Sequence, residues 1–299
     1  MGSEYYVTYT SSEDLSAEVS QLLSSIEESF SVRVEGSVVS RINAAGSGEE
    51  VTLTQEEAAV LLAAFEIARE SDGAFDPAIL PLVKAWGFDP PYWMNGEEPP
   101  SATTIAQAKS LSDRLLFELN NEQNTIVKSD ADACMDLGAA IKGYAAERVR
   151  DLVKDKAKEA LVYVGGTIAA VGKNYEIGVT PPRDSEESFA FRFTLQAGEI
   201  CATSGDYERF YIYDGVRYHH ILDAKTGYPA SSGVISATVV SEDGLLADAL
   251  ATAVVVLGAQ KGAGLLKKCG AKGAIVTEDK KIINCGLSVT VKDKSYEIA

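Results

Sequence analysis

The sequence predicts an α+β protein in which helices pack against mixed, largely antiparallel sheets. Helical and strand-like segments follow one another without the strict strand–helix–strand rhythm of a parallel sheet. Hydrophobic residues make up 46% of the 299 positions, which is enough for a sizeable core, whereas a disordered chain has low hydrophobicity. No internal repeat is visible, and we expect one continuous unit over residues 1–299, with residues 86–101 as the weakest place for a boundary.

The first half of the chain predicts a strand followed mainly by helices. Residues 4–10 alternate like a strand, and residues 11–32 carry apolar positions at helical spacing. Thr54 with Glu57 three positions later has the pattern of a capping box, which predicts a second helix. The segment 86–101, rich in Pro, Gly and aromatic residues, predicts an ordered loop. Further elements expected in this half are a helix over 103–111 and strands over 115–119 and 125–129.

The second half predicts one long helix and then a strand-rich region. Residues 135–156 read as a strand end, a turn of small residues and a long helix. Several strands separated by glycine turns follow between residues 159 and 241, which favours antiparallel pairing. Residues 244–270 predict a helical segment, and short strands close the chain.

The charge balance limits the classes of partner. The formal net charge is −17, which argues against nucleic-acid binding, because phosphate backbones attract clustered Lys and Arg. It also disfavours electrostatic attraction to anionic membranes. An anionic substrate would therefore need local help, from a metal ion or from helix N-termini.

The cysteines and the chain start carry little information about the compartment. Cys134, Cys201, Cys269 and Cys285 are far apart in apolar surroundings with no CxxC spacing, so we expect buried thiols that pack as small hydrophobic residues. No apolar stretch reaches the ~18 residues of a membrane span, and no basic-then-apolar signal peptide opens the sequence. The expectation is a cytosolic protein or one whose leader has been removed.

Asp248 and Thr252 are candidate metal ligands. They lie four residues apart in "LLADALATA", so that on a helix both oxygens project from one face. The other residues there are Leu and Ala, and a carboxylate on such a stripe needs a partner when it is buried. One alternative is a solvent-exposed aspartate near a helix start. The other is a hard-cation site that suits Mg²⁺, which binds few protein oxygens and leaves room for phosphates.

Small residues open the predicted helix of "MDLGAAIKGYA". Gly138, Ala139, Ala140 and Gly143 clear side chains from the helix start, where N–H groups and the positive dipole end suit a phosphate. Lys142 could add a positive charge. The spacing is not that of a P-loop, so tight packing without a ligand remains the alternative.

Two turns carry aspartates beside aromatic residues, Asp76 in "SDGAFDPA" and Asp206 in "TSGDYERF". Turn aspartates commonly bond their own backbone, and a ligand-binding role is the other possibility. Gly165 and Gly166 end a predicted strand, either as a bulge or as a close approach to a ligand.

Both histidines of the chain stand side by side in "RYHHILDAKTGYP". Neighbours on a strand point to opposite faces, so at most one of His219 and His220 faces a given site. A neutral imidazole there could act as a base or orient a ligand near pH 7.

Taken together, these motifs resemble the ApbE family over nearly the whole chain. The resemblance is carried, in family order and approximate spacing, by "DLGAAIKGYA", "VGGTIAAVG", "ATSGDYE", "HHILDAKTGYP" and "ADALATA", with "MGS" and "GAFDP" as further matches. It implies a single ApbE-like unit and an FAD:protein FMN transferase. Such an enzyme cleaves FAD with Mg²⁺, passes FMN to a Thr or Ser hydroxyl of an acceptor flavoprotein subunit, and releases AMP.

The resemblance also implies roles for particular residues. Asp248, Thr252 and the main-chain carbonyl of Ala139 match metal ligands, and His220 matches a histidine proposed to help activate the acceptor. The positions that match residues lining the FAD site are Met1, Ala74, Phe75, Asp76, Asp136, Lys142 and Ile235.

Two departures from the family pattern stand out: Ala224 replaces a usual proline after the motif aspartate, and Tyr163 replaces a polar residue before the glycine pair. The first removes a φ restraint from the turn. An FAD pyrophosphatase that gives FMN and AMP and a non-catalytic FAD carrier are the alternative functions. The resemblance further suggests a periplasmic or otherwise extracytoplasmic lipoprotein, with a cytoplasmic location as the alternative.

Overall fold

The structure is a computed structural model that describes residues 3–89 and 98–299. The chain divides into two compact units, each assembled from separated stretches. The first unit comprises Met1–Ile26, Ala139–Gly205 and Ser231–Ala299, and the second comprises Glu27–Gly138 and Asp206–Ala230. The fold is α+β, with mostly antiparallel sheets, as the sequence predicts.

The first unit is built on an eight-stranded sheet with the order β1-β5-β6-β9-β14-β15-β16-β18. All neighbouring strands in it are antiparallel except β16 and β18. Its strands are β1 (Tyr5–Thr10), β5 (Glu159–Val164), β6 (Thr167–Val171), β9 (Ile200–Gly205), β14 (Val234–Ser241), β15 (Lys272–Thr277), β16 (Lys281–Cys285) and β18 (Glu297–Ile298).

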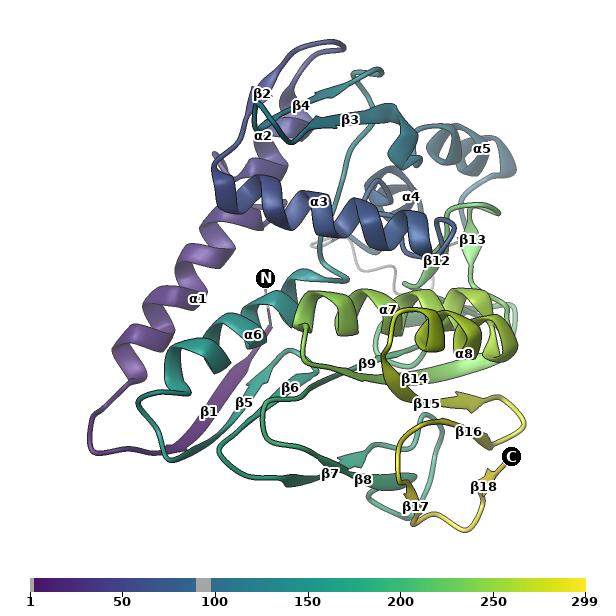
Figure 1. Ribbon diagram of the computed structural model, residues 1–299. Coiled ribbons are helices and arrows are strands. Elements are labelled where there is room, and N and C mark those ends of the chain that lie inside the picture. Colours follow the sequence, from purple (N-terminus) through teal and green to yellow (C-terminus); the bar gives the residue numbers. More distant parts are fainter. Residues whose placement is uncertain (1–2, 90–97) are drawn as a thin grey trace. The chain divides into compact units, whose positions relative to one another are not determined.

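Helices cover one face of this sheet and a smaller sheet covers the other (Figure 1). The helices are α6 (Ile141–Val153), α7 (Gly244–Leu257) and α8 (Ala259–Lys268). The smaller sheet has the order β17-β8-β7, formed by β7 (Tyr175–Val179), β8 (Phe191–Leu195) and β17 (Thr290–Val291). A buried core that includes Phe191, Phe193 and Val276 lies between the two sheets, so the sheet that carries α6 and α7 is fixed from both sides.

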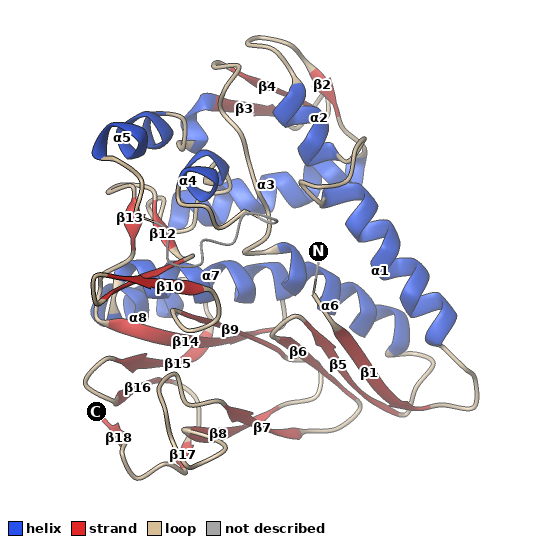
Figure 2. Cartoon of the chain, turned by 180° about the vertical axis from the view of Figure 1, so that it is seen from behind, coloured by secondary structure: helices blue, strands red, loops and turns tan. Residues whose placement is uncertain are grey.

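The second unit combines helices with short strands, which Figure 2 shows by type. Its three-stranded sheet has the order β2-β4-β3, and two hairpins, β10–β11 and β12–β13, follow later in the chain. α1 (Ser16–Phe30) enters this unit from the first. The remaining helices are α2 (Val38–Ala44), α3 (Gln55–Glu70), α4 (Leu80–Ala85), α5 (Ala102–Ser110) and η1 (Arg114–Leu116), and the strands are β2 (Val51–Thr52), β3 (Phe117–Asn120), β4 (Thr125–Lys128), β10 (Phe210–Tyr213), β11 (Val216–His219), β12 (Leu222–Asp223) and β13 (Tyr228–Pro229).

Local sequence patterns predicted several elements correctly. Thr54 caps α3 with the complete capping box, since its hydroxyl accepts from the Glu57 N–H and the Glu57 carboxylate accepts from the Thr54 N–H. Gly165 and Gly166 form the two-residue turn between β5 and β6, with φ of 51° and 96°, so they are one of the glycine turns expected between strands and not the expected bulge. Positive φ at both positions is the geometry of a type I′ hairpin turn, which glycine adopts without strain.

Other expectations need correction. The strand end expected directly before α6 is absent, since residues 129–140 form bends, turns and irregular backbone. The helical segment at 244–270 is two helices, α7 and α8, since Gly258 at φ 83° ends the first and starts the second. Only Cys201 among the four cysteines is buried. Residues 90–97 of the expected loop and Met1 lie outside the described residues.

No helix in the described part of the chain combines the length and apolarity that a bilayer crossing requires.

Candidate active site

Two glycines let α6 and α7 approach each other closely. A Cβ built on Gly143 would lie 1.9 Å from the Gly244 carbonyl oxygen, and one built on Gly244 would lie 2.2 Å from the Gly143 carbonyl oxygen. Neither position has room for a side chain. The packing interpretation of the small-residue motif is therefore correct for Gly143.

The two helices also cap each other reciprocally around this contact. The Gly143 N–H donates to Asp248 Oδ2 at 3.0 Å, and the Gly244 N–H donates to Glu147 Oε2 at 2.8 Å. Each acceptor stands four residues after its own helix's glycine, so the contact is nearly symmetric. N–H groups at a helix start have no partner within their own helix, so a carboxylate there satisfies them and complements the dipole. Burial raises the pKa of Glu147.

Asp248 is 4% exposed, which rules out the solvent-exposed alternative. The Lys142 ammonium lies 3.5 Å from Asp248 Oδ2, and the side chain of this lysine is 23% exposed. A buried carboxylate is stable only when it is paired and hydrogen-bonded. Lys142 and the start of α6 together supply that pairing, so Asp248 is held in an electropositive corner of an acidic protein.

Thr252 and Ala139 lie beside the same corner of the first unit. The Thr252 hydroxyl, one turn after Asp248, is 3.1 Å from the Ser204 hydroxyl on β9. Ala139 directly precedes Ala140, the N-cap of α6. In a continued helix the Gly143 N–H would point to the Ala139 carbonyl, but it turns to Asp248 instead. The sequence-predicted ligands therefore gather at the α6–α7 contact.

The donor set fits a hard cation. It consists of one carboxylate, one hydroxyl and one main-chain carbonyl, and oxygen ligands of this kind are typical for Mg²⁺. Among the described residues, no group of three or more His, Cys, Asp or Glu side chains is placed to hold a metal. A cation here would therefore complete its coordination with water or substrate oxygens, as Mg²⁺ at phosphate sites does.

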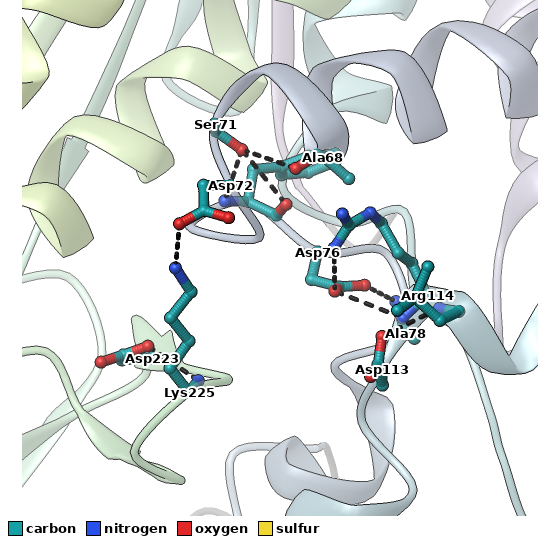
Figure 3. Close-up of polar contacts among 11 residues, drawn as sticks. Ala68, Ser71, Asp72, Asp76, Ala78, Asp113, Arg114, Asp223 and Lys225 are labelled. Carbon is teal, nitrogen blue, oxygen red and sulfur yellow. Dashed lines mark hydrogen bonds and ion pairs between the residues drawn. The ribbon is translucent and has the colours of Figure 1, made fainter.

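Asp76, in the second unit, is a buried carboxylate in a tight turn (Figure 3). Its Oδ1 accepts from the Ala78 N–H at 2.9 Å, and its Oδ2 accepts from the Arg114 N–H at 3.3 Å. The Arg114 guanidinium stands 3.9 Å away. Burial raises the pKa of Asp76 to about 6, although these N–H groups and the arginine oppose the shift. Asp76 therefore shapes its own turn, as turn aspartates commonly do, and also keeps a perturbed pKa.

Asp136 lies next to the Asp76 turn. The Asp136 N–H donates to the Pro77 carbonyl at 2.8 Å, and Asp136 Oδ1 accepts from the Gly138 N–H at 2.8 Å. Ala74 and Phe75 are 7% and 2% exposed, and the Ser71 hydroxyl bonds the N–H and the carbonyl of Phe75, so Ser71 fixes the backbone of this turn. The second unit thus brings together the two turns that the resemblance assigns to FAD.

The histidines differ in environment. His219 is 6% exposed, its Nε2 donates to the Ala230 carbonyl at 2.9 Å, and its Nδ1 accepts from the Ile221 N–H at 3.3 Å. Both ring nitrogens are therefore used in holding the turn. His220 is half-buried just after β11, and its Nδ1 donates to the Arg209 carbonyl at 3.2 Å. Because a carbonyl only accepts, this bond places the proton on Nδ1 and the lone pair of the neutral ring on Nε2.

The turn after the histidines is held without the missing proline. Asp223 Oδ1 accepts from the Lys225 N–H at 2.9 Å, and the Asp223 carbonyl accepts from the Gly227 N–H at 2.7 Å. Gly227 has φ 83°, which suits glycine. The Lys225 ammonium pairs with the Asp72 carboxylate, which joins this turn to the Asp76 turn (Figure 3). The turn that contains Ala224 is therefore restrained by several hydrogen bonds although it lacks the proline.

Ile235 and Tyr163 occupy the first unit. Ile235 is 4% exposed within the core between the sheets, at a register shift of β14 against β15. A bulge of this kind redirects the strand. Tyr163 packs against Tyr6 on the neighbouring strand, with ring centroids 5.7 Å apart.

Sequence reasoning missed Arg114, Arg209, Lys128 and Asn43. The Arg114 guanidinium lies 3.9 Å from Asp76 Oδ2. Burial lowers the pKa of Arg209, and the negative charge of Asp136 opposes this shift. Lys128 and Asn43 form hydrogen bonds with the main chain of the loop before Asp136. Arg114 and Asn43 have partners that are distant in sequence, Asp76 and Met135, and the main-chain carbonyls that bind Lys128 belong to irregular backbone, so no local motif signals these residues.

Comparisons with known proteins identify the family of the chain. The model of the ApbE family matches residues 1–276. The chain is 33% identical to the FAD:protein FMN transferase of Klebsiella pneumoniae over 279 residues, covering 92% of this chain and 86% of that protein. It is 32% identical to the protein of the same name from Treponema pallidum over 282 residues, covering 89% of this chain and 77% of the relative.

Solved structures extend the likeness to the whole fold. The ApbE protein of Thermotoga maritima superposes with a TM-score of 0.80 at 31% identity, with 97% of both chains covered. The flavin transferase ApbE of Vibrio cholerae gives a TM-score of 0.83 at 25% identity, covering 99% of this chain and 95% of the other. The protein belongs to the ApbE family.

Proposed function

We propose that this protein is an FAD:protein FMN transferase. It would use Mg²⁺ to cleave the FAD pyrophosphate and transfer FMN to a Thr or Ser hydroxyl of an acceptor flavoprotein subunit. The observation that carries the proposal is the buried Asp248 carboxylate, which Lys142 and the start of α6 hold beside the Thr252 hydroxyl. The names of the relatives in Klebsiella and Treponema support the transfer of FMN from FAD to a protein.

The α6–α7 contact would bind the metal and the pyrophosphate. Asp248, Thr252 and the Ala139 carbonyl would hold Mg²⁺, and the Lys142 ammonium would move toward a phosphate oxygen. When bound, the metal would neutralise phosphate charge and favour ionisation of the attacking hydroxyl. Phosphoryl transfer depends mainly on positioning and charge stabilisation, so rigid glycine packing beneath the ligands is the property such a site needs.

The acceptor hydroxyl would attack the phosphorus on the FMN side of the pyrophosphate. A new ester bond forms to FMN, the bond between that phosphorus and the bridging oxygen breaks, and AMP leaves with the bridging oxygen. The hydroxyl proton needs an acceptor. His220 is the candidate, because the bond from its Nδ1 to Arg209 puts the lone pair on Nε2.

The remaining candidate residues would bind FAD. Asp136 and Asp76 would accept hydrogen bonds from its hydroxyl or N–H groups, and Ala74, Phe75 and Ile235 would line the site. Met1 keeps the assignment that the resemblance gives it. An extracytoplasmic, lipid-anchored location belongs to the same proposal, and fractionation of producing cells with a tagged chain would test it.

Incubation with FAD and Mg²⁺, with and without an acceptor subunit, separates the alternatives. Fluorescent acceptor and AMP indicate the transferase, FMN and AMP without acceptor indicate the pyrophosphatase, and unchanged FAD indicates a carrier. Asp248→Ala should abolish the metal-dependent turnover. Asp243→Asn is the matched control, because this exposed residue of the same helix caps α7 through its side chain and asparagine caps as well. Normal turnover by Asp248→Ala would contradict the metal assignment.

A further inference from the structure

Lys128, the last residue of β4, is a buried lysine whose ammonium is held by main-chain carbonyls. The residue is 1% exposed. Its Nζ donates to the carbonyls of Asn43 at 2.8 Å, Ala131 at 2.8 Å and Ala133 at 3.0 Å. An ammonium has three N–H donors, so these bonds use all of them. In the described part of the chain, Lys128 therefore acts as a fixed cation among carbonyl dipoles.

The three carbonyls come from two places. Asn43 belongs to α2, whereas Ala131 and Ala133 belong to the irregular loop that leads toward Asp136. A charged group is expensive to bury unless it is fully hydrogen-bonded. The lysine is thus stable only while this loop keeps its position, and the loop is likewise fixed by the lysine.

Asn43 extends the restraint to the next residues of the loop. Its Nδ2 donates to the Met135 carbonyl at 2.9 Å, and its Oδ1 accepts from the Met135 N–H at 2.8 Å. A side-chain amide that bonds both main-chain groups of one residue fixes that residue like a strand partner. The next N–H, that of Asp136, donates to Pro77 in the Asp76 turn.

We propose that Lys128 and Asn43 are positioning residues for the FAD site. Through consecutive bonds at residues 131, 133 and 135 they set where the Asp136 carboxylate stands against the Asp76 turn. This inference rests on the proposed function, because it assumes that Asp136 contacts FAD. Neither residue needs to touch the ligand.

Lys128→Met tests the inference, because methionine keeps most of the apolar stem and removes the three donors. We expect the Kd for FAD, measured by calorimetry on the folded protein, to rise about 10- to 100-fold, the loss for one misplaced charge-assisted hydrogen bond. Lys109→Met is the matched control, since it removes one exposed lysine of the same unit. The control should keep the wild-type Kd.

A second variant separates positioning from general destabilisation. Lys128→Ala leaves a space with the outline of propylammonium, and this probe should restore FAD affinity, whereas sodium chloride at equal ionic strength should not. Hydrogen exchange of the amides at 133–136 should quicken in Lys128→Ala without FAD and slow again with propylammonium. This readout does not depend on enzymatic activity.

The outcomes distinguish the two levels of inference. If the wild-type protein fails to bind FAD, the proposed function is wrong. If the wild type binds FAD and Lys128→Met binds it with the same Kd, the positioning role is wrong although the function stands. Unchanged exchange at residues 133–136 in Lys128→Ala would also overturn it.

Discussion

Replacing Gly143 by alanine tests whether the α6–α7 contact holds the candidate metal ligand. The added Cβ would lie 1.9 Å from the Gly244 carbonyl oxygen and 2.8 Å from the Asp248 Cβ. Both neighbours belong to the first turns of a packed helix, and one is backbone, so neither can swing away. The helices must separate by on the order of 1 Å to reach ordinary contact distances.

The expected energy follows from three effects. Overpacking of this kind costs about 1–3 kcal/mol, and stretching the Gly143 N–H bond to a buried carboxylate loses part of the roughly 1.5–3 kcal/mol of a charged hydrogen bond. Alanine recovers about 1 kcal/mol through its helix propensity. We therefore expect the free energy of unfolding to fall by about 2–4 kcal/mol.

Urea unfolding measures this change, and Gly264→Ala is the control. A Cβ at Gly264, on α8, meets nothing within 4 Å, so that variant should gain about 0.5–1 kcal/mol. Metal-dependent FAD turnover of folded Gly143→Ala should drop about 10²-fold, because Asp248 shifts with the helix. The reasoning is refuted if Gly143→Ala is as stable as Gly264→Ala and turns FAD over at the wild-type rate.

Two further predictions concern the second unit. Burial raises the pKa of Asp76 from 3.8 to about 6, so the folded state binds this proton more tightly, and its contribution to stability is present below pH 3.8 and lost as pH rises to about 6. Asp76→Asn should remove this loss of unfolding free energy, which amounts to roughly 3 kcal/mol at most. Urea unfolding of both proteins between pH 4 and 7 measures it. A difference between variant and wild type that does not change with pH would contradict the prediction. His220→Asn should slow FMN transfer about 10²–10⁴-fold with unchanged FAD affinity. His219→Asn should keep the transfer rate and lose about 1–3 kcal/mol of stability, and the reverse pattern would exchange their roles.

Sequence patterns predicted what depends on neighbours along the chain. The capping box of α3, the glycine turn between β5 and β6, and the spacing of Asp248 and Thr252 all involve residues within four positions of one another. In such cases the local backbone geometry decides which residues come together, so the sequence pattern alone predicts the contact.

Contacts between distant segments could not be predicted in this way. Gly143 and Asp248 are 105 residues apart, and Lys128 reaches Asn43 across 85. Whether a glycine faces another helix or a lysine is buried depends on the packed fold. The strand expected before α6 was wrong for the same reason, because side chains of Lys128 and Asn43 satisfy backbone groups there that a sheet would otherwise pair.

The net charge of the chain is −17, but the candidate site also contains positive groups. At the α6–α7 contact, Asp248 faces the Lys142 ammonium and an N–H of a helix start, so its negative charge is already compensated before any ligand binds. A phosphate that approached Lys142 would compete with Asp248 for this one cation. In the proposed reaction a divalent cation would remove the competition, because it would bind the carboxylate and leave Lys142 available to the phosphate. The pairing of Lys142 with Asp248 is therefore the reason to expect that phosphate binding at this contact depends on a divalent cation.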